Sequence, residues 1–202
     1  MRGLSSPRTF SIAIAVLLVA VAIGILLKTR ADFHRAPLYA GTPVVPPKFA
    51  PDAVLTNQDG RPAHVFGAAA PATFLFFGYT HCPDACSLAL ASLGRAYRML
   101  PPALAARIRI VFVSVDPERD VPAVMKRYVA AFDAPIAGLT GSRAQLKPVW
   151  DDYGVTVDPS SKEISHGDAI YAIDATQHVI LIYPPEVQAR DLASDAAKML
   201  SP

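Results

Sequence analysis

Residues 74–87 read FLFFGYTHCPDACS, and this stretch decides the fold because an apolar run leads directly into a pair of cysteines. The run at 73–79 is short, apolar and aromatic, which predicts a buried strand. The segment 87–100 that follows has its apolar residues at helical spacing and stops at two prolines. Cys82 and Cys86 therefore fall where a buried strand turns into a helix, a place where open α/β sheets collect ligand and catalytic groups.

The rest of the chain predicts further strands and helices around this unit. Residues 107–115 form a β-branched run, which indicates a second long strand parallel to the first. Upstream, Asn57-Gln58-Asp59-Gly60 predicts a turn between two short strands. Downstream we expect a helix from an Asp120 cap to Phe132, a helix from a Ser142 cap to Gly154, a hairpin of strands at 168–174 and 178–183, and a helix at 187–200. Together these elements predict an α/β, thioredoxin-like fold with an N-terminal β-hairpin.

The N-terminal quarter of the chain has a different composition. Residues 10–27 are 18 residues without a charge, which is long enough to predict a single transmembrane helix. A cleaved signal peptide and a buried core helix are the alternatives. Frequent prolines after this run favour extended backbone. We therefore expect an N-terminal tail at 1–9, a transmembrane anchor at 10–27, a proline-rich tether at 28–48 and a thioredoxin-like domain at 49–202 outside the cytoplasm.

The charge of the chain argues against one class of function. The formal net charge is +2 at pH 7, and basic residues form no run beyond the flanks of residues 10–27. Proteins that bind nucleic acid carry a basic patch or stripe. We therefore expect no nucleic-acid partner.

The cysteine pair leaves three uses open: a redox couple, ligands of a soft metal, or a structural staple. The amino end of a helix offers N–H groups and partial positive charge, which favour thiolates. Thioredoxin-type redox motifs place two residues between their cysteines, whereas three separate Cys82 from Cys86, and the wider gap favours a metal. A staple is disfavoured because so short a loop would stabilise little. Two thiolates alone suit copper poorly if the ion must also be released, so a third ligand, most naturally an imidazole, would complete a site.

His166 is the best candidate for that third ligand among the five histidines. It lies directly before the strand predicted at 168–174, and in a thioredoxin-like sheet the loop before this strand lies beside the cysteine turn. The remaining histidines lie in the tether, in the N-terminal hairpin, next to the first cysteine and at the start of the last strand; they are His34, His64, His81 and His178.

Four segments, in this order and spacing, resemble the Sco/SenC family of copper chaperones. They read FFGYTHCPDAC, VFVSVDPERDVPAVMKRYVAAF, GLTGS and SHGDAIYAID. The resemblance runs from about Phe49 to Leu200 and implies a thioredoxin-like, copper-binding domain. It also implies that Cys82, Cys86 and His166 bind one copper, as Cu(I) or Cu(II). The implied role is assembly of the binuclear copper centre of cytochrome c oxidase subunit II, by delivering copper, by reducing the target's cysteines, or both.

Two positions depart from the usual family pattern. The family commonly has proline directly after the second cysteine, where this chain has Ser87. It commonly has Asp-His-Ser around the metal histidine, where this chain has Ser165-His166-Gly167. An acidic neighbour can orient a ligating imidazole, and here the nearest downstream carboxylate is Asp168. The three implied ligands are all present.

The leading expectation is a membrane-tethered copper chaperone, which is not an enzyme in the strict sense. The alternative is a thiol–disulfide oxidoreductase that reduces the cysteines of a partner's copper site. A peroxidase-like thiol enzyme is disfavoured, because that class activates a single cysteine. Expected partners are cytochrome c oxidase subunit II or another copper-site protein, other copper chaperones or thiol reductases, and the membrane. The expected location is the inner membrane, single-pass, with the soluble domain in the periplasm or an equivalent non-cytoplasmic compartment.

Overall fold

The structure is a computed structural model that describes residues 7–35, 39–67, 70–157 and 168–201. The chain divides into two compact units, the first ending at Leu38 and the second beginning at Tyr39. The first unit contains helix α1 (Pro7–Arg35), which holds the apolar run, and the large apolar side chains between Ile14 and Leu27 are exposed. In the part of the chain that the structure describes, no helix is both long enough and apolar enough to cross a membrane. The anchor expected at residues 10–27 stays a prediction.

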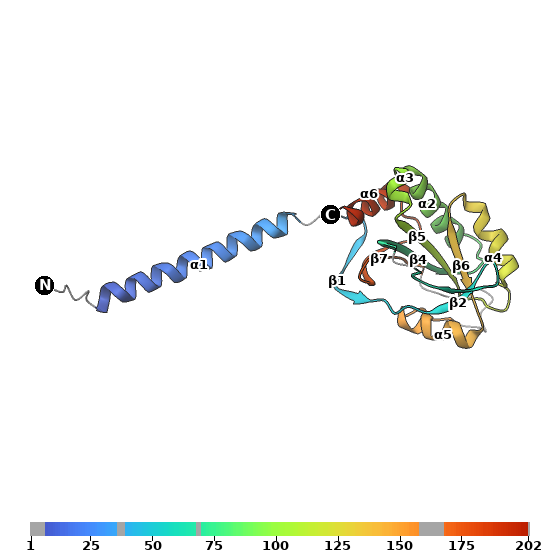
Figure 1. The fold of residues 1–202 in the computed structure, drawn as a ribbon, viewed down its shortest axis with the longest axis horizontal. Helices are drawn as coiled ribbons and strands as arrows, with labels where there is room; N and C mark the ends of the chain where they lie inside the picture. Colours follow the sequence, from blue (N-terminus) through green and yellow to red (C-terminus); the bar gives the residue numbers. More distant parts are fainter. Residues whose placement is uncertain (1–6, 36–38, 68–69, 158–167, 202) are drawn as a thin grey trace. The chain divides into compact units, whose positions relative to one another are not determined.

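The second unit is built on one mixed sheet of eight strands in the order β1-β8-β7-β4-β5-β6-β2-β3 (Figure 1). Strand β4 pairs in parallel with β5, and β5 pairs in parallel with β6, whereas the remaining pairs are antiparallel. The predicted parallel pair and the α/β, thioredoxin-like class are confirmed. The strands are β1 (Thr42–Phe49), β2 (Val54–Asn57), β3 (Pro62–His64), β4 (Ala72–Gly78), β5 (Ile108–Ser114), β6 (Ile136–Thr140), β7 (Ile170–Asp174) and β8 (His178–Tyr183).

Helices cover both faces of this sheet, which is why the central strand β4 is apolar except for Thr73 and is buried at every residue. On one face Phe74 lies with Leu93 of α2 and Leu192 of α6 around a small apolar cavity. On the other face Phe77 packs on Tyr153, which follows α5, with ring centroids 5.1 Å apart. The helices are α2 (Ala85–Met99), α3 (Pro102–Ala105), α4 (Pro122–Val129), α5 (Arg143–Asp152) and α6 (Ala189–Leu200), and a 3-10 turn, η1 (Ala130–Phe132), continues α4.

Two local signals in the sequence are confirmed by the backbone. The predicted N-terminal hairpin is the antiparallel pair β2–β3, and its turn is closed by the Gly60 N–H donating to the Asn57 carbonyl at 2.9 Å. Gly60 has φ of +76°, the left-handed conformation that favours glycine. Ser142 caps α5 in a reciprocal arrangement with Gln145, because each side chain bonds the other's backbone N–H.

The tether predicted at 28–48 is wrong in its second half, because Thr42–Phe49 forms the edge strand β1 and pairs with β8. The buried carboxylate of Asp195 in α6 explains this position. It accepts the backbone N–H groups of Ala40 and Gly41 at 2.8 and 2.9 Å, and the hydroxyl of Tyr183 at 3.1 Å. Pro43, Pro46 and Pro47 are tolerated because an edge strand needs fewer backbone donors.

Strand β6 was not predicted from the sequence. Its five residues contain Gly138, which weakens the strand pattern. The glycine is explained by helix α4, because a Cβ at this position would lie 3.1 Å from Cγ1 of Val129. Close packing of α4 on β6 therefore hides the strand from a reading of local periodicity.

Candidate metal and thiol site

The two cysteines lie together at the turn between β4 and α2. Strand β4 ends at Gly78 and α2 begins at Ala85, so Cys82 precedes the helix and Cys86 is its second residue. The backbone N–H of Cys86 points at the sulfur of Cys82, with a nitrogen–sulfur distance of 3.4 Å. Cys82 is half-buried and Cys86 is fully buried, and both are thiols in this structure. The turn thus presents one accessible sulfur with a second sulfur behind it.

Gly78 leaves the space that the inner sulfur occupies. A Cβ at this position would lie 2.8 Å from Sγ of Cys86 and 2.9 Å from the ring of Phe112, closer than carbon approaches either atom. The last residue of β4 must therefore be glycine for Cys86 to keep its place against the sheet. This glycine links the end of the strand to the position of a candidate ligand.

Burial raises the pKa of the Cys86 thiol well above its usual range. The hydrogen bond with Cys82 and the negative charge of Asp168 act in the same direction. Cys86 therefore keeps its proton at neutral pH. A metal ion that binds this sulfur must displace the proton, so binding would release it to solvent.

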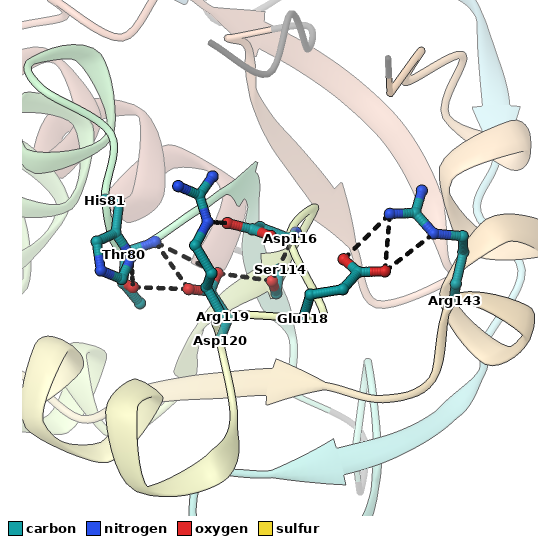
Figure 2. Close-up of polar contacts among 8 residues, drawn as sticks. All are labelled: Thr80, His81, Ser114, Asp116, Glu118, Arg119, Asp120 and Arg143. Atoms are coloured by element: carbon teal, nitrogen blue, oxygen red, sulfur yellow. Dashed lines mark hydrogen bonds and ion pairs between the residues drawn. The ribbon is translucent and has the colours of Figure 1, made fainter. Parts of the chain in front are cut away.

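A network of buried polar groups supports the neighbouring turn, between β5 and α4 (Figure 2). The buried carboxylate of Asp120 accepts the hydroxyl of Thr80 at 2.6 Å and the hydroxyl of Ser114 at 2.6 Å. It also accepts the backbone N–H of Thr80 at 3.2 Å. Thr80 lies two residues before Cys82, so Asp120 joins the cysteine turn to the end of the adjacent strand β5. Burial raises the pKa of Asp120, and the hydrogen bonds from Ser114 and Thr80 oppose that shift.

The prediction that Asp120 caps a helix is therefore wrong. Helix α4 has Val121 at its N-cap position, and the Asp120 side chain bonds across to Thr80 and Ser114. The sequence around Asp120 resembles a helix start because an acidic residue precedes a proline in the first turn. One partner of this carboxylate, Thr80, lies 40 residues away in the chain, so a local pattern does not reveal the contact.

His81, Asp116 and Asp120 also lie close enough to hold an ion, with candidate ligand atoms within 4.8 Å of one another. The hydrogen bonds and the ion pair of these three side chains indicate a structural role instead. Asp116 is ion-paired with Arg119, and Nδ1 of His81 shares a hydrogen bond with the Thr80 hydroxyl at 3.0 Å. Asp120 already accepts the hydroxyls described above. On the exposed side of the same turn, Glu118 pairs with Arg143 at 2.9 Å (Figure 2).

A second contact reaches the cysteine helix from α4. The hydroxyls of Ser87 and Tyr128 share a hydrogen bond at 3.4 Å. The Tyr128 ring packs against Phe112 and Phe132, with centroid distances of 5.6 and 5.3 Å. Burial raises the pKa of Tyr128 to about 12, so its hydroxyl stays protonated at neutral pH. Sequence reasoning missed Thr80, Ser114 and Tyr128, whose roles depend on contacts between distant segments.

The structure brings together two of the predicted site residues, Cys82 and Cys86. His166 lies outside the described residues, so its assignment stays a prediction. Two sulfur donors side by side suit a soft metal such as Cu(I), and they also suit dithiol–disulfide exchange. A thioredoxin-like sheet with two neighbouring thiols at a strand-to-helix turn defines a protein of thiol or soft-metal chemistry.

Comparison with known sequences narrows this class to one family. Residues 44–201 match the sequence profile of the SCO1/SenC family, which is most of the chain. The chain therefore belongs to the SCO1/SenC family. A similar curated relative is the mitochondrial SCO2 homolog of Bos taurus, 38% identical over 112 residues, which are 54% of this chain and 41% of the relative. The regions that align with this chain make up 64%, 41% and 36% of the length of three curated relatives.

Solved structures agree with the family assignment. The apo Sco1 protein of Thermus thermophilus has a TM-score of 0.72 and 31% identity, and the match covers 82% of this chain and 99% of that one. ScoI of Bradyrhizobium japonicum, solved with copper bound, has a TM-score of 0.67 and 30% identity, covering 75% and 99% of the two chains. The thioredoxin-like α/β fold is thus shared with Sco proteins.

Proposed function

We propose that this protein is a copper chaperone that binds one copper ion through Cys82, Cys86 and His166. The observation that carries the proposal is the pair of sulfurs at the amino end of α2, held with the Cys86 N–H directed at Sγ of Cys82, in a chain of the SCO1/SenC family. Thiolates are soft ligands that select Cu(I), and an added imidazole suits both Cu(I) and Cu(II). Copper is cargo here, which the protein binds and then releases.

The different exposure of the two sulfurs suits transfer of the ion. A partner's cysteines would reach the half-buried Cys82 first and the buried Cys86 last. Ligands would then exchange one at a time, and the ion would move without becoming free. When the two cysteines form a disulfide, neither sulfur can bind copper as a thiolate, so the redox state of the pair would control loading.

The proposed target is the binuclear copper centre of cytochrome c oxidase subunit II, as the family resemblance implies. Other copper chaperones would supply the ion, and thiol reductases would keep the pair reduced. The match spans only part of the curated relatives' length, so these partners belong to the proposal and are tested by direct transfer. The copper-loaded protein should load the reduced apo form of the subunit II copper domain in a one-to-one mixture.

The proposal places the domain on the non-cytoplasmic side of the inner membrane, with residues 10–27 as a single-pass anchor. The exposed apolar side chains of α1, from Ile14 to Leu27, support this location because they would otherwise face water. The test is membrane fractionation followed by extraction at high pH. Recovery of the full chain in the soluble fraction would contradict the anchor.

Copper binding is the first experiment. We expect the reduced full chain to bind one Cu(I) in competition with a chromophoric chelator. Replacement His166→Ala should weaken binding by about tenfold or more, which is about 1.4 kcal/mol. His178→Ala is the matched control, because His178 bonds within its own turn through Thr176 and should leave the affinity unchanged. Unchanged binding in His166→Ala would remove the three-ligand site from the proposal.

The second candidate function is thiol–disulfide exchange on a partner's copper site. One observation favours it: the accessible Cys82, as a thiolate, could attack a partner's disulfide, and the buried Cys86, after losing its proton, could then resolve the mixed disulfide. The two functions separate in a single comparison. If the parent binds copper weakly, and His166→Ala changes neither that binding nor the reduction of an oxidised subunit II domain, the protein is a dithiol reductase.

A further inference from the structure

The segment from Asp120 to Tyr128 contacts the chain on both sides of the two cysteines. Before the cysteines, Thr80 donates its hydroxyl to Asp120 at 2.6 Å. After them, Ser87 shares a hydrogen bond with Tyr128 at 3.4 Å. Asp120 lies two residues before the start of α4, and Tyr128 lies within this helix. Residues 81–86, which contain both sulfurs, are therefore bracketed by two contacts to the same helical segment.

Neighbouring aromatic rings hold Tyr128 in place for this contact. Phe112 of β5 and Phe132 of the 3-10 turn pack against its ring, and Tyr128 itself is half-buried. The hydroxyl is thus carried on a side chain with little freedom. A proline, the residue that commonly follows the second cysteine in the family, has no hydroxyl and could not share this bond. The Ser87–Tyr128 contact is accordingly a feature of this chain.

Disulfide formation requires the bracketed segment to change its shape. A disulfide brings its sulfurs to about 2.05 Å with a narrow range of torsion angles. In the dithiol form the Cys86 N–H is directed at Sγ of Cys82, and Sγ of Cys86 is packed beside Gly78. Closure must move one or both sulfurs out of these positions. Contacts that fix both ends of the segment resist that movement and so favour the dithiol.

We propose that Tyr128 is a positioning residue that acts through Ser87 to hold Cys86 in the dithiol geometry and so opposes closure of the Cys82–Cys86 disulfide. The reaction concerned is exchange with oxidised glutathione: the two protein thiols form one S–S bond, and the glutathione disulfide breaks to give two molecules of reduced glutathione. This inference goes beyond copper transfer, because it concerns the copper-free protein and requires no third ligand.

A double-mutant cycle on the copper-free full chain tests the contact. The parent, Tyr128→Phe, Ser87→Ala and the double variant are equilibrated with glutathione redox buffers, and the disulfide fraction is measured by thiol labelling. Loss of one net hydrogen bond corresponds to roughly a fivefold change in the equilibrium constant. We expect each single variant to favour the disulfide by about fivefold, making its potential about 20 mV more negative. The double variant should shift no further than either single one.

Two controls separate positioning from general loss of structure. Ser87→Thr keeps the hydroxyl and should keep the parent potential. Ser92→Ala removes another hydroxyl from α2, one that bonds Arg95 at 3.5 Å, and should also leave the potential unchanged. A parent-like potential in Tyr128→Phe, or additive shifts in the double variant, would overturn the proposal. Because no copper is present, either result leaves the His166→Ala binding experiment unaffected.

Discussion

Two turns at the same edge of the sheet are built from similar lengths of chain but from different chemistry. The β4–α2 turn carries Cys82 and Cys86, and the β5–α4 turn carries Asp116 and Asp120. Both follow strands that are adjacent and parallel, so both lie where an open sheet collects functional groups. In the second turn the carboxylates are buried and bonded to Arg119 and to the hydroxyls of Thr80 and Ser114. In the first, one sulfur is half-exposed above a buried partner.

The two turns therefore have different roles in one site: the β5–α4 turn supports the structure, and the β4–α2 turn carries the reactive sulfur. Carboxylates would attract a cation if they faced solvent without partners, but here protein donors already satisfy them. They stabilise the fold and fix the position of Thr80, whereas the accessible sulfur of Cys82 remains open to an ion or a thiol. Position at the edge of a sheet therefore identifies a functional region, and the hydrogen-bond partners identify which turn supports it and which one reacts.

The largest effect is expected from breaking the supporting turn. Asp120→Ala removes the acceptor for the hydroxyls of Thr80 and Ser114. We therefore expect the free energy of unfolding to fall by about 3 kcal/mol. Chemical denaturation of the copper-free protein measures it. Asp151→Ala, in an exposed pair with Lys147, is the matched control and should cost about 0.5 kcal/mol. A loss below 1 kcal/mol in Asp120→Ala would show that the network contributes little.

The next effect tests how tightly the reactive turn fits the strand below it. Gly78→Ala places a Cβ against Sγ of Cys86 and the Phe112 ring, so we expect a loss of about 2 kcal/mol in stability and weaker Cu(I) binding. Gly60→Ala is the control, since it meets open space but needs a positive φ. It should cost about 1 kcal/mol and leave copper binding intact. Equal copper affinities for the two variants would contradict the proposed role of Gly78.

A smaller effect should distinguish the two sulfurs within the reactive turn. We expect iodoacetamide to modify Cys82 about tenfold faster than Cys86 at pH 7.5, with each rate measured in the variant whose other cysteine is serine. Because burial raises the pKa of Cys86, a smaller fraction of it is thiolate at a given pH than for an ordinary cysteine. The modification rate of Cys86 should therefore keep rising at pH values above the usual pKa of a thiol. Mass spectrometry of the labelled peptides reports both rates. Equal rates would show that burial does not separate the thiols.

The smallest effect is expected on the exposed side of the supporting turn. Glu118 and Arg143 form an ion pair in which the Glu118 side chain is exposed and the Arg143 side chain is partly exposed, so Glu118→Gln should cost about 0.5 kcal/mol or less. The loss should shrink further in high salt, because screening weakens exposed charge pairs. Thermal unfolding at two salt concentrations measures both. A loss near that of Asp120→Ala would mean that the exposed ion pair stabilises the turn as strongly as the buried hydrogen bonds of Asp120.

Much of the fold, and the position of the two cysteines in the site, were predictable from the sequence. The strands at 73–79 and 107–115, the helix after the cysteines, the hairpin turn at Asn57–Gly60 and the Ser142 cap all correspond to structural elements. Each depends on neighbours within a few residues, so periodicity and turn chemistry reveal it. The same reasoning missed β6, whose glycine is explained by close packing of α4. It also assigned β1 to a tether, because the segment before β1 is held by Asp195, which lies 155 residues beyond Ala40.

The apolar run and the helical spacing that follows it place two cysteines where a buried strand meets a helix, and this was enough to indicate thiol or soft-metal chemistry. Three further features are visible only in the folded protein: Asp120 bonds Thr80, Gly78 leaves space for the Cys86 sulfur, and Tyr128 bonds Ser87. The physical reason is the distance along the chain. Local propensity is encoded by adjacent residues, whereas these contacts form when packing of β4, β5 and α4 brings distant residues together.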